Sequence, residues 1–200
     1  FRLSNIKDPF IYLTFSGDVK PDELLSFFPV PEIISAGGSL RLNMVLSGKP
    51  GNKKRYSISD IISLHPMADI AFNSFYLNHK NPLWSVDDAD GNLMVAGNVW
   101  AEDLVFSCRG QRFRVNGEFG NLPAWLAGSN VTLKVNADIS TGNFDPVSFM
   151  GDTSNTAEGE KRAYSFPSDI EAMVRFKTDN LVYGSFSAEK ISGLLKYRRG

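Results

Sequence analysis

Apolar and polar residues alternate along much of this 200-residue chain. The alternation is clearest over residues 11–16, 40–47, 112–119, 131–140 and 170–177. A period of two residues is typical of β-strands that bury one face and expose the other. Strands with one apolar face and one polar face usually pair antiparallel. The pattern therefore predicts a mostly β protein built on an antiparallel sheet.

Helix signals are few and short. Pro21 followed by two acidic residues is typical of a first helical turn, so residues 21–28 are predicted to form a helix. Further short helices are predicted at residues 57–64, 122–126 and 145–150. This is too little helix to cover the apolar face of a sheet. A second sheet, the curvature of the sheet itself or a ligand must then cover that face.

The polar stretches between the strands predict turns and loops. Asp90 and Gly91 have the composition of a hairpin turn. We prefer this turn to a calcium loop, because the surrounding acids do not match the ligand positions of such a loop. Residues 151–162 contain no large apolar side chain and are predicted to form an exposed polar loop.

The chain is predicted to be a single β-rich segment, residues 1–200, with a weak internal repeat. Residues 13–28 resemble residues 133–150, since each is an alternating strand followed by a short helix. The chain begins at Phe1 in strand-like sequence, without an initiator Met or a signal peptide. We therefore expect it to be a segment of a longer protein.

The composition favours packing over chemistry. Fifteen of the residues are Phe, which has no polar group and suits an apolar core or an apolar ligand. The 21 Lys and Arg against 22 Asp and Glu give a near-neutral balance, which argues against a dedicated nucleic-acid binder. No stretch reaches the roughly 18 apolar residues of a membrane helix.

The residues that usually carry catalysis do not form a recognisable constellation. His65 and His79 match no metal or triad spacing, and no nucleophile elbow or phosphate-binding loop is present. Cys108 follows an apolar stretch, so we predict a buried thiol. One cysteine excludes a disulfide within the chain and a multi-cysteine zinc site. We accordingly expect no catalytic residues, no metal and no cofactor, and a protein that is not an enzyme.

Two further groups are candidates for binding. Trp84, Trp100 and Trp125 would form a sugar-stacking platform if at least two of them shared one exposed surface, although the apolar neighbours of Trp100 and Trp125 favour packing. A basic cluster, with solvation in a loop as the alternative, is the candidate contact for anionic lipid head groups. Its residues are Lys49, Lys53, Lys54 and Arg55.

The order of these elements resembles the AsmA-like family of bacterial envelope proteins, in particular its periplasmic C-terminal-type region. In that family a strand, a Gly-x-Phe or Gly-x-Leu motif, a small loop, a second alternating strand ending near Asp and a short helix recur in sequence. The residues that carry the resemblance here are 15–19, 40–48, 103–128, 131–139, 144–147, 168–184 and 187–193. The likeness covers most of the chain. It lies in the order and spacing of strands, loops and short helices more than in exact sequence motifs.

The resemblance implies an extended, curved sheet with an apolar concave face, either groove-like or closed like a sandwich. It further implies a periplasmic domain, anchored in the inner membrane by a helix outside this chain and involved in outer-membrane biogenesis. Such a domain would bind or guide phospholipid or other acyl chains, and the family offers no catalytic residues to transfer. The candidate groove residues are Leu13, Phe15, Leu42, Met44, Phe113, Val115, Leu133, Val135, Val174 and Phe176.

Two alternatives remain open from the sequence. One is a carbohydrate-binding or adhesin-like β-sandwich, which the tryptophans would serve. The other is a purely structural β segment, whose apolar face packs against neighbouring repeats of the full-length protein.

Overall fold

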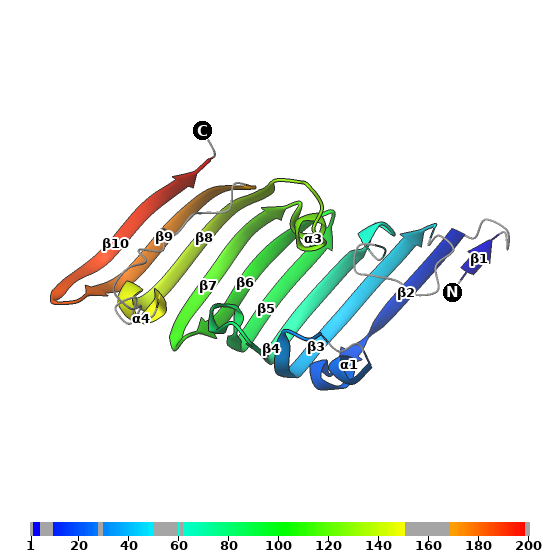
Figure 1. The fold of residues 1–200 in the computed structure, drawn as a ribbon, viewed down its shortest axis with the longest axis horizontal. Helices are drawn as coiled ribbons and strands as arrows, with labels where there is room; N and C mark the ends of the chain where they lie inside the picture. The colour runs from blue at the N-terminus through cyan, green and yellow to red at the C-terminus, as the bar shows by residue number, and fades with distance from the viewer. Residues whose placement is uncertain are drawn as a thin grey trace, which may run out of the picture.

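One sheet of ten strands makes up most of the structure. The computed structural model describes residues 2–4, 10–27, 30–49, 60, 62–150 and 169–198. Among these, the strands lie side by side in chain order, from β1 at one edge to β10 at the other (Figure 1). The predicted mostly β fold is confirmed, and the sheet is open and groove-like, with no second sheet among the described residues.

The strands have the following bounds: β1 (Arg2–Ser4), β2 (Phe10–Val19), β3 (Ile33–Gly48), β4 (Met67–His79), β5 (Val86–Ala96), β6 (Asn98–Cys108), β7 (Gln111–Gly120), β8 (Leu133–Phe144), β9 (Ile170–Tyr183) and β10 (Phe186–Tyr197). The short helices are α1 (Pro21–Phe27), η1 (Pro82–Trp84), α3 (Leu122–Leu126) and α4 (Pro146–Met150). Three predicted helices are thus confirmed as α1, α3 and α4. Half of the predicted helix at 57–64 lies outside the described residues, as does the whole of the predicted loop at 151–162.

All neighbouring strands pair antiparallel except β8 and β9, which run in the same direction. Parallel neighbours need a connection that returns from the end of one strand to the start of the next. The chain between β8 and β9 includes α4 and makes this return, whereas short turns join β5 to β6 and β6 to β7. The sheet is therefore mixed, although antiparallel pairing predominates as predicted.

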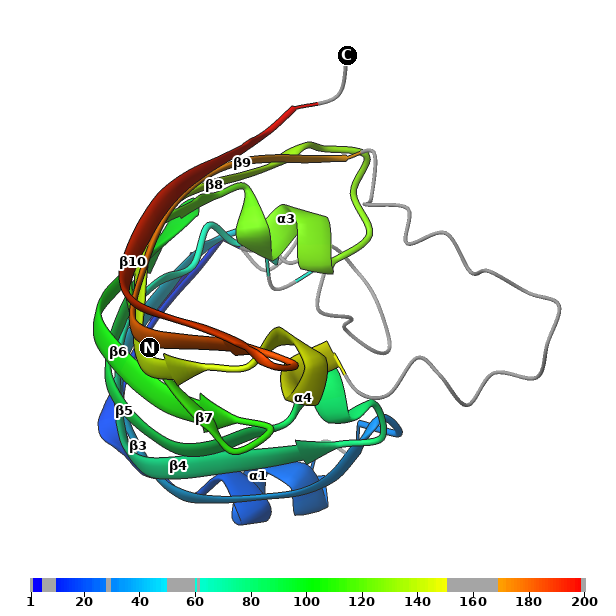
Figure 2. The ribbon, with the colours of Figure 1, turned by 90° about the vertical axis from the view of Figure 1, so that its left-hand side faces the viewer.

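The sheet is strongly curved, and both α3 and α4 lie on its concave side (Figure 2). A row of irregular residues crosses β3 to β6 where the strand register shifts. Its members have positive φ angles: 83° at Gly38, 45° at Ser74, 121° at Gly91 and 46° at Asp103. β-Bulges of this kind bend a strand and increase its twist. The row therefore contributes to the curvature of the sheet.

The predicted hairpin turn at Asp90 and Gly91 is wrong, because both residues lie inside β5. Gly91 uses its conformational freedom for a bulge and not for a turn between strands. Asp90 stabilises the neighbouring bulge in β4, because its Oδ1 accepts a hydrogen bond of 3.0 Å from the backbone N–H of Ser74. Composition alone does not separate a turn from a bulge, since both favour Asp and Gly.

The strand register sorts side chains onto two chemically different faces. One row of paired residues, on the concave face, is apolar from β2 to β10: Phe15, Met44, Ala68, Val95, Val99, Phe119, Val135, Ala172 and Tyr197. The neighbouring row on the convex face is mostly polar: Ser16, Asn43, Asp69, Met94, Trp100, Glu118, Asn136, Met173 and Lys196. The alternation in the sequence thus becomes a division between the inside and the outside of the curve.

Ion pairs between neighbouring or nearby strands stabilise the polar side. Arginine side chains contact carboxylates in the pairs Arg41–Asp18, Arg112–Asp88, Arg114–Asp103 and Arg175–Asp138. All of these side chains are well exposed, so each pair adds little to the free energy of folding. Their arrangement nevertheless keeps charge on the outside. No helix of the described residues has the length and hydrophobicity needed to cross a membrane.

Candidate functional site: an apolar trough

The register places all ten predicted groove residues on the concave face. The burial of these side chains differs along the sheet. Phe113, Val115 and Leu133, in β7 and β8, are buried, whereas Phe15 in β2 is 42% exposed. The concave face is therefore a trough that is packed more tightly around β7 and β8 than at the β2 end.

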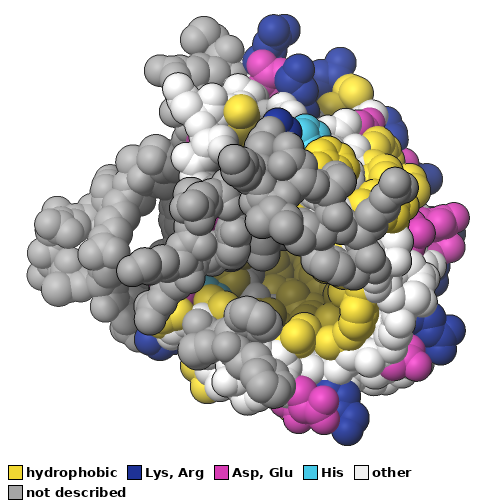
Figure 3. All heavy atoms as spheres, turned by 90° about the vertical axis from the view of Figure 1, so that its right-hand side faces the viewer, with side chains coloured by type: hydrophobic (Ala, Val, Ile, Leu, Met, Phe, Trp, Pro, Cys, Tyr) yellow, Lys and Arg dark blue, Asp and Glu magenta, His cyan; other side chains and the backbone are white. Residues whose placement is uncertain are grey.

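The side chains of the described residues cover this trough incompletely. Among the described residues, no large side chain is fully buried. Viewed from the N-terminal end of the sheet, hydrophobic side chains line a hollow, and charged side chains lie around the outside (Figure 3). The described helices and strands thus leave the apolar face uncovered along part of its length.

A cluster of phenylalanines forms the best-packed part of the trough. The ring centroids of Phe113 and Phe149 are 5.5 Å apart, and those of Phe144 and Phe176 are 5.1 Å apart. Phe106 extends the cluster, at 5.9 Å from Phe113. Sequence reasoning identified Phe113 and Phe176 but missed the others. Phe149 belongs to α4, so period-two alternation gave no signal for it.

Hydrogen bonds hold α4 over one end of the trough. The guanidinium of Arg109 donates to the backbone carbonyl of Phe149, and the side chain of Gln111 donates to that of Asp145. Asp145 caps the helix by accepting from the N–H groups of Val147 and Ser148 at 2.9 and 3.2 Å. Hydrogen bonds from Ser148 lower the pKa of Asp145 below its ordinary value of 3.8.

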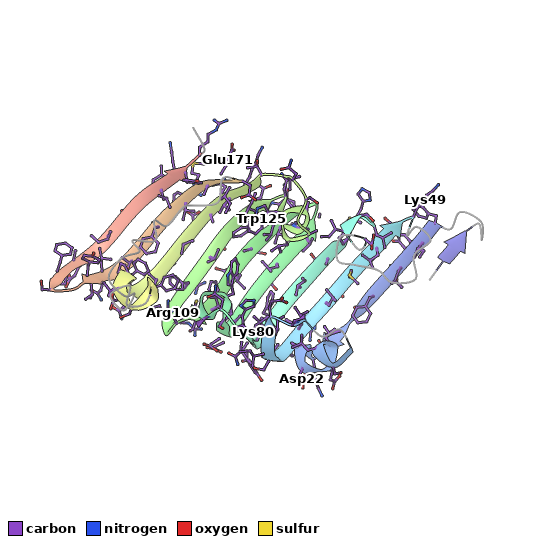
Figure 4. The ribbon with its side chains drawn as sticks, in the orientation of Figure 1. Asp22, Lys49, Lys80, Arg109, Trp125 and Glu171 are labelled. Atoms are coloured by element: carbon purple, nitrogen blue, oxygen red, sulfur yellow. The ribbon has the colours of Figure 1, made fainter. Side chains whose placement is uncertain are left out.

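At the opposite end of the strands, α3 is attached to the start of β9. Trp125 Nε1 donates a hydrogen bond of 2.6 Å to Asp169 Oδ2. Figure 4 shows Trp125 and Arg109 at opposite ends of the strands. The two helices therefore border the trough at both ends of β7 and β8. The hydrogen bond of Trp125 ties α3 to the residue that precedes β9.

A hollow of about 1100 Å³ lies at the α4 end of β7 to β10. Arg112, Arg114 and Lys177, whose side chains lie on the convex face, line this hollow together with Arg109 and Lys190. Because its lining carries these convex cationic side chains, the hollow does not belong to the apolar trough.

The described residues bring no reactive constellation together. Cys108 is buried, as predicted, and burial raises the pKa of its thiol above 9.0, although nearby Arg109 opposes this shift. His79 Nδ1 accepts a 2.9 Å hydrogen bond from the N–H of Asn81, and His65 is exposed. Within the described part of the chain, no three His, Cys, Asp or Glu residues are grouped closely enough to hold a metal ion.

The three tryptophans do not share a surface. Trp84 is 59% exposed in η1, at the end of β4, whereas Trp125 lies in α3 at the other end of the strands. Trp100 lies in β6 with its side chain on the convex face. The condition for a sugar-stacking platform of two or more tryptophans is therefore not met.

The predicted head-group cluster falls mostly outside the described residues. Lys49 is exposed at the end of β3, whereas Lys53, Lys54 and Arg55 are not described. Contact of this cluster with anionic head groups therefore stays a prediction from the sequence.

No family model matches this chain, and neither a curated protein nor a solved structure matches it. The resemblance to the AsmA-like family stays a prediction from the sequence.

Proposed function

We propose that this chain is a non-enzymatic domain that binds or guides lipid acyl chains along its concave face. The observation that carries the proposal is the apolar row that runs without interruption from β2 to β10. A second such row, from Leu42 in β3 to Leu195 in β10, runs beside it. Together the two rows offer a continuous apolar surface.

The dimensions of the trough suit an extended aliphatic chain. Neighbouring strands lie about 4.8 Å apart, so the surface from β2 to β10 extends for about 38 Å across the strands. Each methylene group that leaves water for this surface contributes about 0.8 kcal/mol. Binding would need no specific polar contacts along the length of the chain.

The mechanism is passive. An acyl chain lies against the apolar rows, and no covalent bond forms or breaks. The positions that follow one another along the two rows are all apolar, although an acyl chain gains less free energy where the side chains are already buried, as at Val99 and Ala137, than at the exposed Phe15. A ligand could therefore move along the trough without crossing a polar barrier.

The likeness to AsmA-like proteins supplies the biological setting of the proposal. In this setting the chain is a periplasmic domain that takes part in outer-membrane biogenesis and phospholipid passage. It is held at the inner membrane by a segment that is not part of this sequence, and neighbouring repeats would extend the trough.

A matched pair of variants tests the proposal. Phe15→Asp places a carboxylate on the concave face, whereas Thr14→Asp places it on the convex face one residue away. Phe15 is 42% exposed, so we expect both variants to fold. After purification from a bacterial host, native mass spectrometry should detect bound phospholipid on the wild type and on Thr14→Asp, and at least about fivefold less on Phe15→Asp.

Equal lipid occupancy in the two variants would contradict the proposal. So would a wild-type protein that stays free of lipid after incubation with phospholipid vesicles. That second result would favour a structural segment whose apolar face packs against protein.

A further inference from the structure

The convex face carries an apolar area that the trough does not explain. Most of this face is polar, but over β3 to β6 it also presents apolar side chains. We call five of them the convex patch: Val45, Met67, Met94, Ala96 and Trp100. Met67 is 52% exposed and Met94 is 48% exposed. Exposed methionines beside a tryptophan are typical of surfaces that bind other molecules, because Met adapts its shape and Trp contributes a large contact area.

Two adjoining hollows lie in the convex patch. One has a volume of about 320 Å³ and is bounded by Trp100, Asn92 and Glu102. The other, of about 390 Å³, is bounded by Met67, Val45 and Ala96. Asn43, Asp69 and Met94 line both. The hollows therefore form one shallow depression with Met94 at its centre.

The depression carries uncompensated negative charge. Asp69 and Glu102 form no hydrogen bond or ion pair with another described side chain, whereas Asp18 pairs with Arg41. Arg41 is the only cationic side chain that lines the first hollow among the described residues, and Asp18 already neutralises it. The strand register places Asp69 and Trp100 on either side of Met94, with Glu102 two residues beyond Trp100.

We propose that the convex patch is a docking site for a basic segment of a partner protein, with a Lys or Arg side chain lying over Trp100 between Asp69 and Glu102. A cation above an indole ring is attracted by the negative face of the ring. The two carboxylates attract the same cation electrostatically from either side. Apolar side chains of the partner then cover Met67 and Met94.

This docking site is independent of the proposed lipid trough. Asp69 and Trp100 lie on the convex face, whereas Ile70 and Ala101, the next residues along the same strands, lie on the concave face. A partner on the convex patch would leave the trough open. Failure of one proposal therefore carries no consequence for the other.

Nuclear magnetic resonance of the whole chain tests the docking site, with an octapeptide of alternating Lys and Leu as the probe. Each tryptophan gives one indole N–H signal, and Trp100→Phe identifies that of Trp100. We expect the Lys-Leu peptide to shift the Trp100 signal and to leave that of Trp84 in place. An octapeptide of alternating Glu and Leu should leave both unchanged.

Charge variants separate local contacts from the net charge of the protein. Asp69→Asn combined with Glu102→Gln removes both carboxylates of the depression, and we expect it to weaken binding of the Lys-Leu peptide about fivefold to tenfold. Asp179→Asn combined with Glu189→Gln removes the same charge from exposed positions on β9 and β10, and it should leave binding unchanged.

Several results would overturn the inference. An unshifted Trp100 signal, equal shifts with the Lys-Leu and Glu-Leu peptides, or equal weakening by the two double variants each contradict a cation site at Trp100. A Trp100 signal that moves with maltose but not with the Lys-Leu peptide would assign the depression to a carbohydrate and would likewise overturn the docking site.

Discussion

Gly38 and Gly91 hold positions in the curved sheet that other residues would strain. A Cβ atom on Gly38 would lie 2.3 Å from the carbonyl oxygen of Ser74, and one on Gly91 would lie 2.4 Å from that of Asp103. Both glycines also have positive φ angles. The backbones of neighbouring strands therefore approach closely along the row of bulges, and the missing side chains are what permit this.

Replacing Gly91 with Ala should destabilise the protein by about 3 kcal/mol, from the positive φ angle and the contact with Asp103 together. Gly97→Ala is the matched control, because Gly97 also has a positive φ angle but a Cβ atom there would point into open space, with nothing within 4 Å. We expect that variant to lose about 1 kcal/mol. Urea unfolding measures both losses, and equal values would contradict a close approach at Gly91.

At the scale of the element, the short helix α4 depends on one carboxylate. Asp145 accepts hydrogen bonds from two backbone N–H groups and from the hydroxyl of Ser148. Pro146 follows it, and a proline at the first helical position has no N–H to satisfy. Asp145 thereby fixes where the helix begins and how Phe149 enters the phenylalanine cluster.

Asp145→Ala should accelerate hydrogen exchange at the amides of Val147 and Ser148, whereas Asp145→Asn should exchange almost as slowly as the wild type, because Asn also caps helices well. Exchange measured by nuclear magnetic resonance at neutral pH compares them directly. The pKa of Asp145 is lowered, so the wild-type cap should persist above pH 3.8 and weaken as the pH falls through the lowered pKa. Rapid exchange in Asp145→Asn as well would indicate that the charge, and not the cap geometry, holds α4.

The elements differ in how far the sequence predicts them. Val115 and Val135 could be assigned to one face of the sheet, because successive side chains of a strand point to opposite faces. The parallel pairing of β8 and β9 could not be predicted, because a period of two residues carries no information on strand direction. Phe149 joined the cluster through the path of α4, which depends on tertiary contacts with Arg109 and Gln111.

At the scale of the whole molecule, the sheet has two distinct surfaces. The concave side carries apolar rows that cross the sheet as far as β10, and the convex side carries ion pairs together with the convex patch. In a compact domain the apolar rows would meet a second layer. Here only α3 and α4 lie over the concave side among the described helices and strands (Figure 2). An apolar ligand would supply the missing layer.

The central claim is that acyl chains occupy the concave face, and nuclear Overhauser effects between the methylene protons of bound stearate and the methyl groups of the protein test this most directly, because such effects require direct contact. Methyl groups of Leu13, Val135 and Val174 should show these effects, because their side chains line the trough. Those of Val45 and Met67, on the convex face, should show none. Equal effects on both faces, or none on either, would contradict the account.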